Sequence, residues 1–82
     1  MGYVQVPYMI TIYGASWCAP CTASKEMCET IGLEYEFIDV QKDRDAGLMF
    51  KEKGYKTVPQ IFNGETHIGG SEDLLLYIQE LK

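Results

Sequence analysis

The hydrophobic positions of this chain switch between strand-like and helix-like spacing from its beginning onward. Residues 9–13 are nearly all apolar and β-branched, which is typical of a strand buried on both faces of a partly parallel sheet, and the first strand is predicted at residues 8–14. Apolar side chains then recur at roughly helical spacing and Gly32 follows as a stop, so a helix is expected over residues 19–31. Alternation over residues 33–40 predicts a second strand.

A second helix is expected between Asp43 and Gly54. Asp43 suits its N-cap, and Gly54 suits a left-handed C-terminal cap. The inner side of this helix carries the apolar residues Ala46, Met49 and Phe50. One apolar face is therefore available to pack against a sheet.

The dipeptide Asn63-Gly64 is a strong signal for a tight turn between two antiparallel strands. Strands are expected on either side of it, over residues 59–62 and 66–68. These two segments therefore form a hairpin.

A last helix is expected to begin at Ser71, which suits an N-cap. Glu72 and Asp73 suit the positive end of this helix. Its apolar stripe comprises Leu74, Leu75, Ile78 and Leu81.

The predicted order of elements is β-α-β-α-β-β-α. One parallel β-α-β unit followed by an antiparallel hairpin gives an α/β fold, with a mixed four-stranded sheet and three helices against it. A chain of 82 residues encloses one core, so residues 1–82 are expected to form a single domain, with a monomer as the default state.

The formal charge is −5, and the acidic and basic residues are scattered along the chain. There is no basic stripe, which argues against nucleic acid or an anionic membrane as a partner. No apolar run has the length of a membrane span or of the core of a secretion signal, so a soluble, cytoplasmic protein is expected. Three cysteines are too few for a disulfide scaffold, and a cysteine pair in a reducing compartment indicates redox catalysis or metal binding.

Cys18 and Cys21 are the strongest candidates for chemistry. If the helix begins just after Cys18, its sulfur lies where free backbone N–H groups and the helix dipole favour an anion, and a thiolate with a lowered pKa is the expected reactive form. Cys21 is one helical turn further on, close enough to attack a mixed disulfide on Cys18 and release the reduced target. Pro20 is compatible with a helix start. Cys18 is thus the candidate nucleophile and Cys21 the candidate resolving cysteine.

Two other interpretations of this pair remain open from the residues alone. The cysteines could form half of a zinc or iron–sulfur site, for which the chain supplies Cys28 and His67 but no second Cys-x-x-Cys motif. They could also be two buried residues that only pack. The spacing favours redox exchange. Cys28 itself is expected to be a small buried hydrophobe, and His67 a surface or hydrogen-bonded residue with no catalytic part.

Three motifs follow one another along the chain: Trp17-Cys18-Ala19-Pro20-Cys21, Thr57-Val58-Pro59 and Gly69-Gly70. Together with the predicted elements from Met9 onward, they resemble the glutaredoxin family of the thioredoxin superfamily. The resemblance implies a thioredoxin-like fold and an enzyme, a small dithiol–disulfide oxidoreductase that reduces protein disulfides and glutathione mixed disulfides. Glutathione would be its reductant and co-substrate, and no metal would be required.

The resemblance also implies where glutathione binds. Pro59 would have a cis peptide bond beside the cysteines, and the backbone of Val58 would hold a disulfide substrate in an extended pose. Lys56 or a neighbouring lysine would pair with a glutathione carboxylate, while the backbone and side chains at Ser71 and Glu72, at a helix N-terminus, would receive the γ-glutamyl end. The implied binding residues are Lys56, Thr57, Val58, Pro59, Ser71 and Glu72.

The motif around the cysteines differs from the usual glutaredoxin pattern. Glutaredoxins typically have Pro-Tyr between the cysteines and a lysine three residues before the first, where this chain has Ala19-Pro20 and Ala15. Trp17, expected to be partly exposed with a contact role, and Pro20 look more like thioredoxin. Short hybrids of this kind resemble the electron donors of ribonucleotide reductase, including phage-encoded ones. That enzyme is therefore a candidate partner beside other disulfide proteins, and a flavin-dependent reductase is a candidate electron source.

Two alternatives belong to other classes of function. In an iron–sulfur carrier, Cys18 from two chains, together with glutathione, would hold a cluster across a dimer. In a thioredoxin-fold interaction module, the cysteine pair would be kept only for its shape. A Cys-x-x-Cys pair at a helix start argues against the second alternative.

Overall fold

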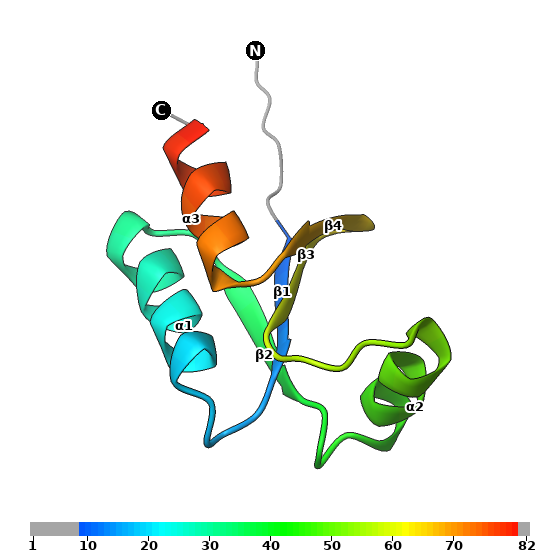
Figure 1. Ribbon diagram of the computed structural model, residues 1–82. Coiled ribbons are helices and arrows are strands. Elements are labelled where there is room, and N and C mark those ends of the chain that lie inside the picture. Colours follow the sequence, from blue (N-terminus) through cyan, green and yellow to red (C-terminus); the bar gives the residue numbers. More distant parts are fainter. Residues whose placement is uncertain (1–8, 81–82) are drawn as a thin grey trace.

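The computed structural model describes residues 9–80, and its elements follow the predicted order (Figure 1). The elements are β1 (Ile10–Gly14), α1 (Ala19–Ile31), β2 (Tyr35–Asp39), α2 (Arg44–Lys53), β3 (Gln60–Asn63), β4 (Thr66–Gly69) and α3 (Ser71–Glu80). The first helix has its predicted bounds, whereas β2 is shorter than the strand predicted at residues 33–40. Tyr8 of the first predicted strand and Leu81 of the last apolar stripe lie outside the described residues. Within residues 9–80, no helix is long and apolar enough to cross a membrane.

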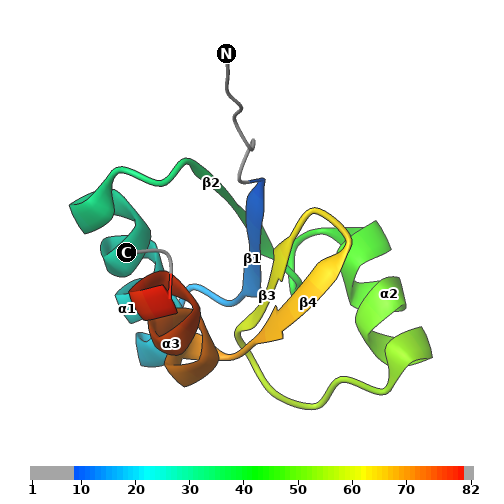
Figure 2. The ribbon, with the colours of Figure 1, turned by 90° about the horizontal axis from the view of Figure 1, so that it is seen from above.

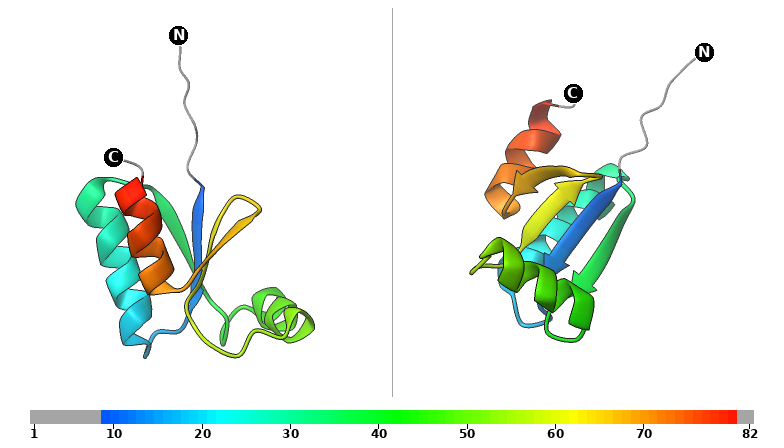
Figure 3. Two further views of the ribbon diagram at one scale, coloured as in Figure 1. Left: turned by 45° about the horizontal axis from the view of Figure 1, so that its top comes forward. Right: turned by 90° about the vertical axis from the view of Figure 1, so that its right-hand side faces the viewer.

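β1 is an inner strand of a four-stranded sheet with the order β2-β1-β3-β4. It pairs parallel with β2 and antiparallel with β3, and the β3–β4 hairpin completes the sheet. α1 and α3 cover one face of the sheet and α2 lies on the other, as Figure 2 and Figure 3 show. A strand with a layer on each face needs apolar residues on both, which explains the nearly continuous apolar run of β1. The predicted mixed α/β architecture is confirmed.

The main core lies between the sheet and the layer formed by α1 and α3. Its buried residues are Ile10, Ile12, Cys28, Ile61, Leu74 and Ile78. Cys28 is fully buried, as predicted for a small hydrophobe. Burial of each large aliphatic side chain stabilises the fold by about 1.5–3 kcal/mol relative to exposure.

Aromatic rings fill the space between the sheet and α2. Tyr13 of β1 packs edge-on against Phe62 of β3, with ring centroids 5.7 Å apart. Phe50 of α2 contacts the ring of Tyr55 at 5.2 Å and that of Tyr13 at 6.1 Å. Tilted and edge-to-face pairs of this kind add about 0.5–1.5 kcal/mol to the effect of burial. Ring packing therefore holds α2 on its face of the sheet.

The ends of α1 and α2 are closed by the predicted residues. The Asp43 carboxylate accepts the backbone N–H of Ala46 at 2.9 Å, which satisfies one free donor in the first turn of α2. Gly32 and Gly54 adopt left-handed φ angles of 79° and 76° at the C-terminal ends of the two helices. Local sequence thus determines where these helices stop.

The predicted N-cap of the last helix is wrong. Ser71 is already the first residue of α3, and Gly70 occupies the cap position, where its carbonyl accepts the N–H of Leu74 at 2.9 Å. The Asp73 carboxylate reaches back and accepts the N–H of Gly70 at 3.0 Å. This is the acidic half of a capping box, which closes the helix without a side chain at the cap.

Leu75 does not belong to the inner stripe of α3. Leu74 is 0% exposed and Ile78 is 6% exposed, whereas Leu75 is 44% exposed. Successive residues of a helix are turned by about 100°, so once Leu74 and Ile78 face the sheet, Leu75 lies on the side of the helix. The buried stripe is therefore narrower than predicted.

Candidate active site

The candidate active site lies at the carboxyl ends of the parallel strands β1 and β2. The loop that leaves β1 carries Cys18, and the loop that precedes β3 carries Val58 and Pro59; both lie toward the same end of the sheet in Figure 1. Ligand sites in open α/β sheets commonly lie at this edge. The fold therefore brings together two motifs that are 40 positions apart in the sequence.

Cys18 and Cys21 form a disulfide bond, with their Cα atoms 5.2 Å apart. Cys18 is the N-cap residue of α1, and its Sγ accepts the backbone N–H of Cys21 at 3.1 Å. A sulfur in this position lies at the positive end of the helix, where a thiolate is stabilised. The predicted placement of the pair at the helix start is confirmed.

Cys18 is buried, although it lies at the end of a helix. It is 4% exposed, and Cys21 is 0% exposed. Both belong to a small buried cluster with Ala15, against which Phe37 and Val58 pack. The little exposed surface of the pair therefore belongs to Cys18.

The Val58–Pro59 peptide bond is cis, as the resemblance implied. The carbonyl oxygen of Val58 lies 3.7 Å from Cys18 Sγ. Pro59 is buried and Val58 is half-buried, so the backbone of this loop lies next to the disulfide. A reduced Cys18 thiol at this position can donate a weak hydrogen bond to the Val58 carbonyl.

An open groove of about 520 Å³ adjoins the cysteine motif. Its lining residues are Pro20, Thr57, Val58, Pro59, Gln60, His67, Gly69, Gly70, Ser71, Glu72 and Asp73. The groove brings together five of the six predicted binding residues, namely Thr57, Val58, Pro59, Ser71 and Glu72. The carboxylate of Asp73 is engaged by the Gly70 N–H, whereas Glu72 is exposed at the start of α3.

Lys56 is not among the residues that line this groove. It lines a smaller hollow of about 200 Å³, together with Trp17 and Gln41. Thr57 and Val58 line both the groove and the hollow, so they lie between the two. The structure therefore places Lys56 on the opposite flank of the Val58 backbone from Ser71 and Glu72.

Trp17 is 68% exposed, as predicted for a contact residue. Its indole Nε1–H donates a hydrogen bond to Gln41 Oε1 at 3.0 Å. This bond holds a large apolar ring beside the cysteines while most of the ring faces solvent. Nothing in the sequence singled out Gln41, because its place depends on the β2–α2 loop meeting the β1–α1 loop.

Gln60 and His67 form a polar wall of the groove that the sequence did not indicate. Gln60 donates from Nε2 to the Thr57 carbonyl at 3.2 Å, and its Oε1 lies 2.7 Å from His67 Nε2. The His67 ring stacks on Phe62 with centroids 4.8 Å apart. His67 is thus an exposed, hydrogen-bonded residue, as predicted, and it supports the loop that carries Thr57.

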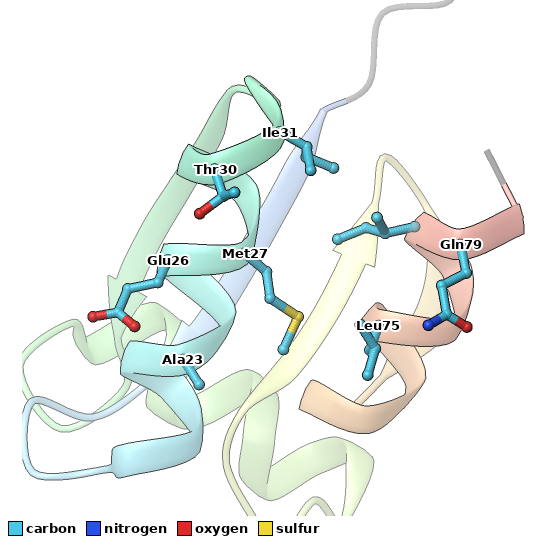
Figure 4. Close-up of a pocket in the computed structure, with 8 residues that line it drawn as sticks. Ala23, Glu26, Met27, Thr30, Ile31, Leu75 and Gln79 are labelled. Carbon is cyan, nitrogen blue, oxygen red and sulfur yellow. The ribbon is translucent and has the colours of Figure 1, made fainter. Parts of the chain in front are cut away.

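A second groove, of about 480 Å³, lies between α1 and α3 and contains none of the cysteines. Figure 4 shows Met27 extending from α1 toward the side of Leu75, while Glu26 points away from α3. The lining of this second groove is largely apolar and includes the exposed side chains of Ile31 and Leu75. The groove therefore offers a surface for contact and no redox group. Across residues 9–80 as a whole, no group of three His, Cys, Asp or Glu residues lies close enough together to hold a metal ion.

Thiol–disulfide exchange on a thioredoxin fold uses a cysteine pair at a helix start, opposite a cis-proline loop, and this is the class that the fold and the site define. A model of the protein family described as Glutaredoxin matches residues 10–68, which is more than half of the chain. The chain therefore belongs to the glutaredoxin family, and it is a thiol–disulfide oxidoreductase.

Individual relatives agree with this assignment. A glutaredoxin of Pseudomonas aeruginosa is 37% identical over 67 residues, which cover 79% of each chain. Among solved structures, the glutaredoxin-like protein NrdH-redoxin of Escherichia coli, which has a thioredoxin-like activity profile, is 26% identical with a TM-score of 0.74, over 85% of this chain and 92% of that one. Buckwheat glutaredoxin, solved in complex with glutathione, shares the fold with a TM-score of 0.72 at 23% identity, over 87% of this chain and 68% of that one.

Proposed function

We propose that this protein reduces protein disulfides and glutathione mixed disulfides, with Cys18 as the nucleophile and Cys21 as the resolving cysteine. The observation that carries the proposal is the Cys18–Cys21 disulfide at the start of α1, next to the carbonyl of Val58. In the reduced protein the Cys18 thiolate attacks a substrate disulfide, bonds to one substrate sulfur and expels the other as a thiolate. Cys21 then attacks Cys18 Sγ, which forms the intrachain disulfide and releases the second substrate sulfur. The substrate gains the two electrons that the cysteine pair loses.

Glutathione is proposed to bind along the groove beside the cysteines and to return the pair to its reduced state. An extended peptide can lie against the backbone of Val58, next to the sulfur that it must reach. The free N–H groups at the start of α3, where Ser71 lies, suit the carboxylate of a γ-glutamyl group, and the exposed Glu72 carboxylate suits its ammonium. The glutathione complex of buckwheat glutaredoxin, on the same fold, supports this choice of ligand.

Lys56 is proposed to hold the other carboxylate of glutathione from the opposite flank of the loop. Thr57 and Val58 line both hollows, so a tripeptide that crosses this loop in an extended pose extends from the Ser71 side to the Lys56 side. An exposed ammonium group is a suitable partner for a carboxylate there. This proposal uses all six predicted binding residues, five of which line the groove while Lys56 lines the neighbouring hollow.

Protein partners are proposed to dock beside Trp17. Its exposed ring adjoins the cysteines and offers the kind of apolar, amphipathic contact that is enriched in protein interfaces. The likeness to a redoxin with a thioredoxin-like activity profile supports a flavin-dependent reductase as an electron source. The Cys-Ala-Pro-Cys motif, which resembles that of the electron donors of ribonucleotide reductase, supports that enzyme as a substrate. Such a reductant works in the cytoplasm, where thiols are kept reduced.

A turnover assay with two arms tests the proposal. One arm supplies glutathione, glutathione reductase and NADPH, and the other supplies thioredoxin reductase and NADPH; the substrates are a glutathione mixed disulfide and a protein disulfide. We expect NADPH oxidation in at least one arm, and loss of turnover in both when Cys18→Ser replaces the nucleophile. Turnover by Cys18→Ser equal to that of the parent protein would refute the proposal.

Lys56→Ala should raise KM for glutathione and leave the thioredoxin reductase arm unchanged. The matched control is Lys51→Ala, because Lys51 is an exposed lysine of α2 that lines neither hollow. Equal KM values for Lys56→Ala and Lys51→Ala would remove Lys56 from the binding site.

A further inference from the structure

Gly14, the last residue of β1, is a glycine for which the backbone gives no reason. It pairs with Asp39 across the parallel β1–β2 ladder, and its carbonyl accepts the N–H of Val40 at 2.9 Å. Its φ angle is not among the positive values that favour glycine, which occur in the described chain at Gly32, Gly54, Gly64 and Gly69. An ordinary L-residue could adopt this backbone conformation.

The reason lies in the space beside Gly14. A Cβ atom added there would lie 2.6 Å from Cys21 Sγ and 3.1 Å from Cys21 Cβ. It would also lie 3.0 Å from Cε1 of Phe37. Carbon and sulfur atoms without a bond between them do not approach as closely as 2.6 Å. The sulfur of Cys21 therefore occupies the volume that any side chain at position 14 would fill.

The sulfur is enclosed on its other sides as well. Cys21 is 0% exposed, in a cluster on which Phe37 packs. The ammonium of Lys25, one helical turn after Cys21, lies 4.4 Å from the centroid of the Phe37 ring, where a cation stabilises the position of the ring. Gly14, Phe37 and the first turn of α1 thus form a slot for one sulfur atom.

We propose that Gly14 is a positioning residue for the resolving thiol, an inference that rests on the proposed function. The absence of a side chain at position 14 lets the Cys21 sulfur lie against β1, where it is aligned with Cys18. In the step concerned, the Cys21 thiolate attacks Cys18 Sγ of a mixed disulfide; the Cys18–Cys21 bond forms, the bond to the substrate sulfur breaks, and the substrate leaves as a thiolate that takes up a proton. The first step, attack by Cys18 on the substrate, does not use the slot.

Gly14→Ala tests this division of the two steps, with oxidised glutathione as the substrate. A methyl group in the slot should displace the Cys21 sulfur. Because a disulfide bond tolerates only a narrow range of geometries, formation of the Cys18–Cys21 bond should then become slower and less favourable. In Gly14→Ala we expect the mixed disulfide between Cys18 and glutathione to persist about tenfold longer than in the parent protein. Acid quenching at successive times and mass spectrometry measure this lifetime. The equilibrium constant for the intrachain disulfide should fall by a similar factor, which corresponds to a reduction potential about 30 mV higher.

The Cys21→Ala background supplies the control, because it removes the sulfur that the added methyl group would meet. In this background the rate at which oxidised glutathione modifies Cys18 should be the same with glycine or alanine at position 14. A general structural effect of Gly14→Ala would slow this rate in both backgrounds.

Several results would overturn the inference. One is a Gly14→Ala protein in which both the lifetime of the mixed disulfide and the reduction potential equal those of the parent. Another is an equal slowing of Cys18 modification by Gly14→Ala in both backgrounds. If Gly14→Ala alone does not fold, the double variant Gly14→Ala/Cys21→Ala decides: its folding supports a conflict with the sulfur, and its failure to fold refutes it. A parent protein that never forms the Cys18 mixed disulfide would refute the proposed function itself, a result that no Gly14 variant can produce.

Discussion

The backbone N–H of Cys21 points at Cys18 Sγ across 3.1 Å, while the side chain of Cys21 forms the disulfide with the same sulfur. The two contacts have different requirements. The N–H group needs only the helix start, whereas the disulfide needs the sulfur of Cys21. Stabilisation of a Cys18 thiolate and resolution of a mixed disulfide can therefore be separated by mutation.

Cys21→Ser should keep the reactivity of Cys18 and lose the second step. Because the backbone donor remains, the rate of Cys18 alkylation by iodoacetamide should stay within about threefold of that of the reduced parent protein. Reduction of a protein disulfide should stop at a mixed disulfide on Cys18, which mass spectrometry detects as an adduct of substrate mass. Release of reduced substrate at the parent rate by Cys21→Ser would show that Cys21 does not resolve the intermediate.

Asp73→Ala should destabilise the protein more than Ser71→Ala. Asp73 accepts the N–H of Gly70 at the start of α3, whereas Ser71 is an ordinary first-turn residue. Loss of a capping carboxylate costs about 1 kcal/mol of unfolding free energy, and the serine change should cost a few tenths. Urea denaturation of the two variants measures both values. A larger loss in Ser71→Ala would restore Ser71 as the cap.

The chemistry of the first helix could be predicted because its signals are local. Pro20 near the start and Gly32 after the end define α1, and the spacing of Cys18 and Cys21 places both sulfurs at one helix end. The order of elements followed from periodicity in the same way. These conclusions, which depend on a few neighbouring residues, were correct, whereas the equally local assignment of Ser71 as the cap of α3 was wrong because Gly70 and Asp73 close that helix.

The features that the sequence did not predict depend on packing between distant segments. Cys18 is buried because the Val58 loop, 40 positions away in the sequence, packs against it. The position of Lys56 depends on the path that the same loop takes after α2. The role of Gly14 is visible only once α1 lies on the sheet. A glycine that ends a buried strand just before a cysteine motif is the one sequence signal that could have indicated this slot.

Leu74→Ala should be far more costly than Leu76→Ala, although both leucines belong to α3. Leu74 is 0% exposed in the main core, and Leu76 is 58% exposed. Removing a buried leucine side chain costs about 2–5 kcal/mol, whereas surface changes usually stay within about 0.5 kcal/mol. Thermal and urea unfolding of the two variants provide the comparison. Similar losses in both would contradict the inward orientation of Leu74.

The buried thiol of Cys28 should make stability fall at high pH. Burial raises the pKa of Cys28 above its ordinary value of 9.0, and the nearby Glu29 carboxylate raises this pKa further. In the unfolded chain the thiol ionises near its ordinary pKa, while the folded protein keeps it neutral to higher pH. The stabilisation from the neutral thiol is therefore fully present below about pH 9 and is lost as the pH rises through the folded-state pKa.

Cys28→Ala isolates this effect, provided that Cys18 and Cys21 stay disulfide-bonded in both proteins and do not titrate. The variant should be less stable than the parent at pH 7, because it leaves a small cavity in the main core. The difference between the two unfolding free energies, measured by urea denaturation from pH 7 to pH 11, should shrink as the pH rises, since only the parent loses stability through this thiol. A difference that stays constant over this range would mean that Cys28 ionises equally readily in the folded and unfolded states, which its complete burial in the core does not allow.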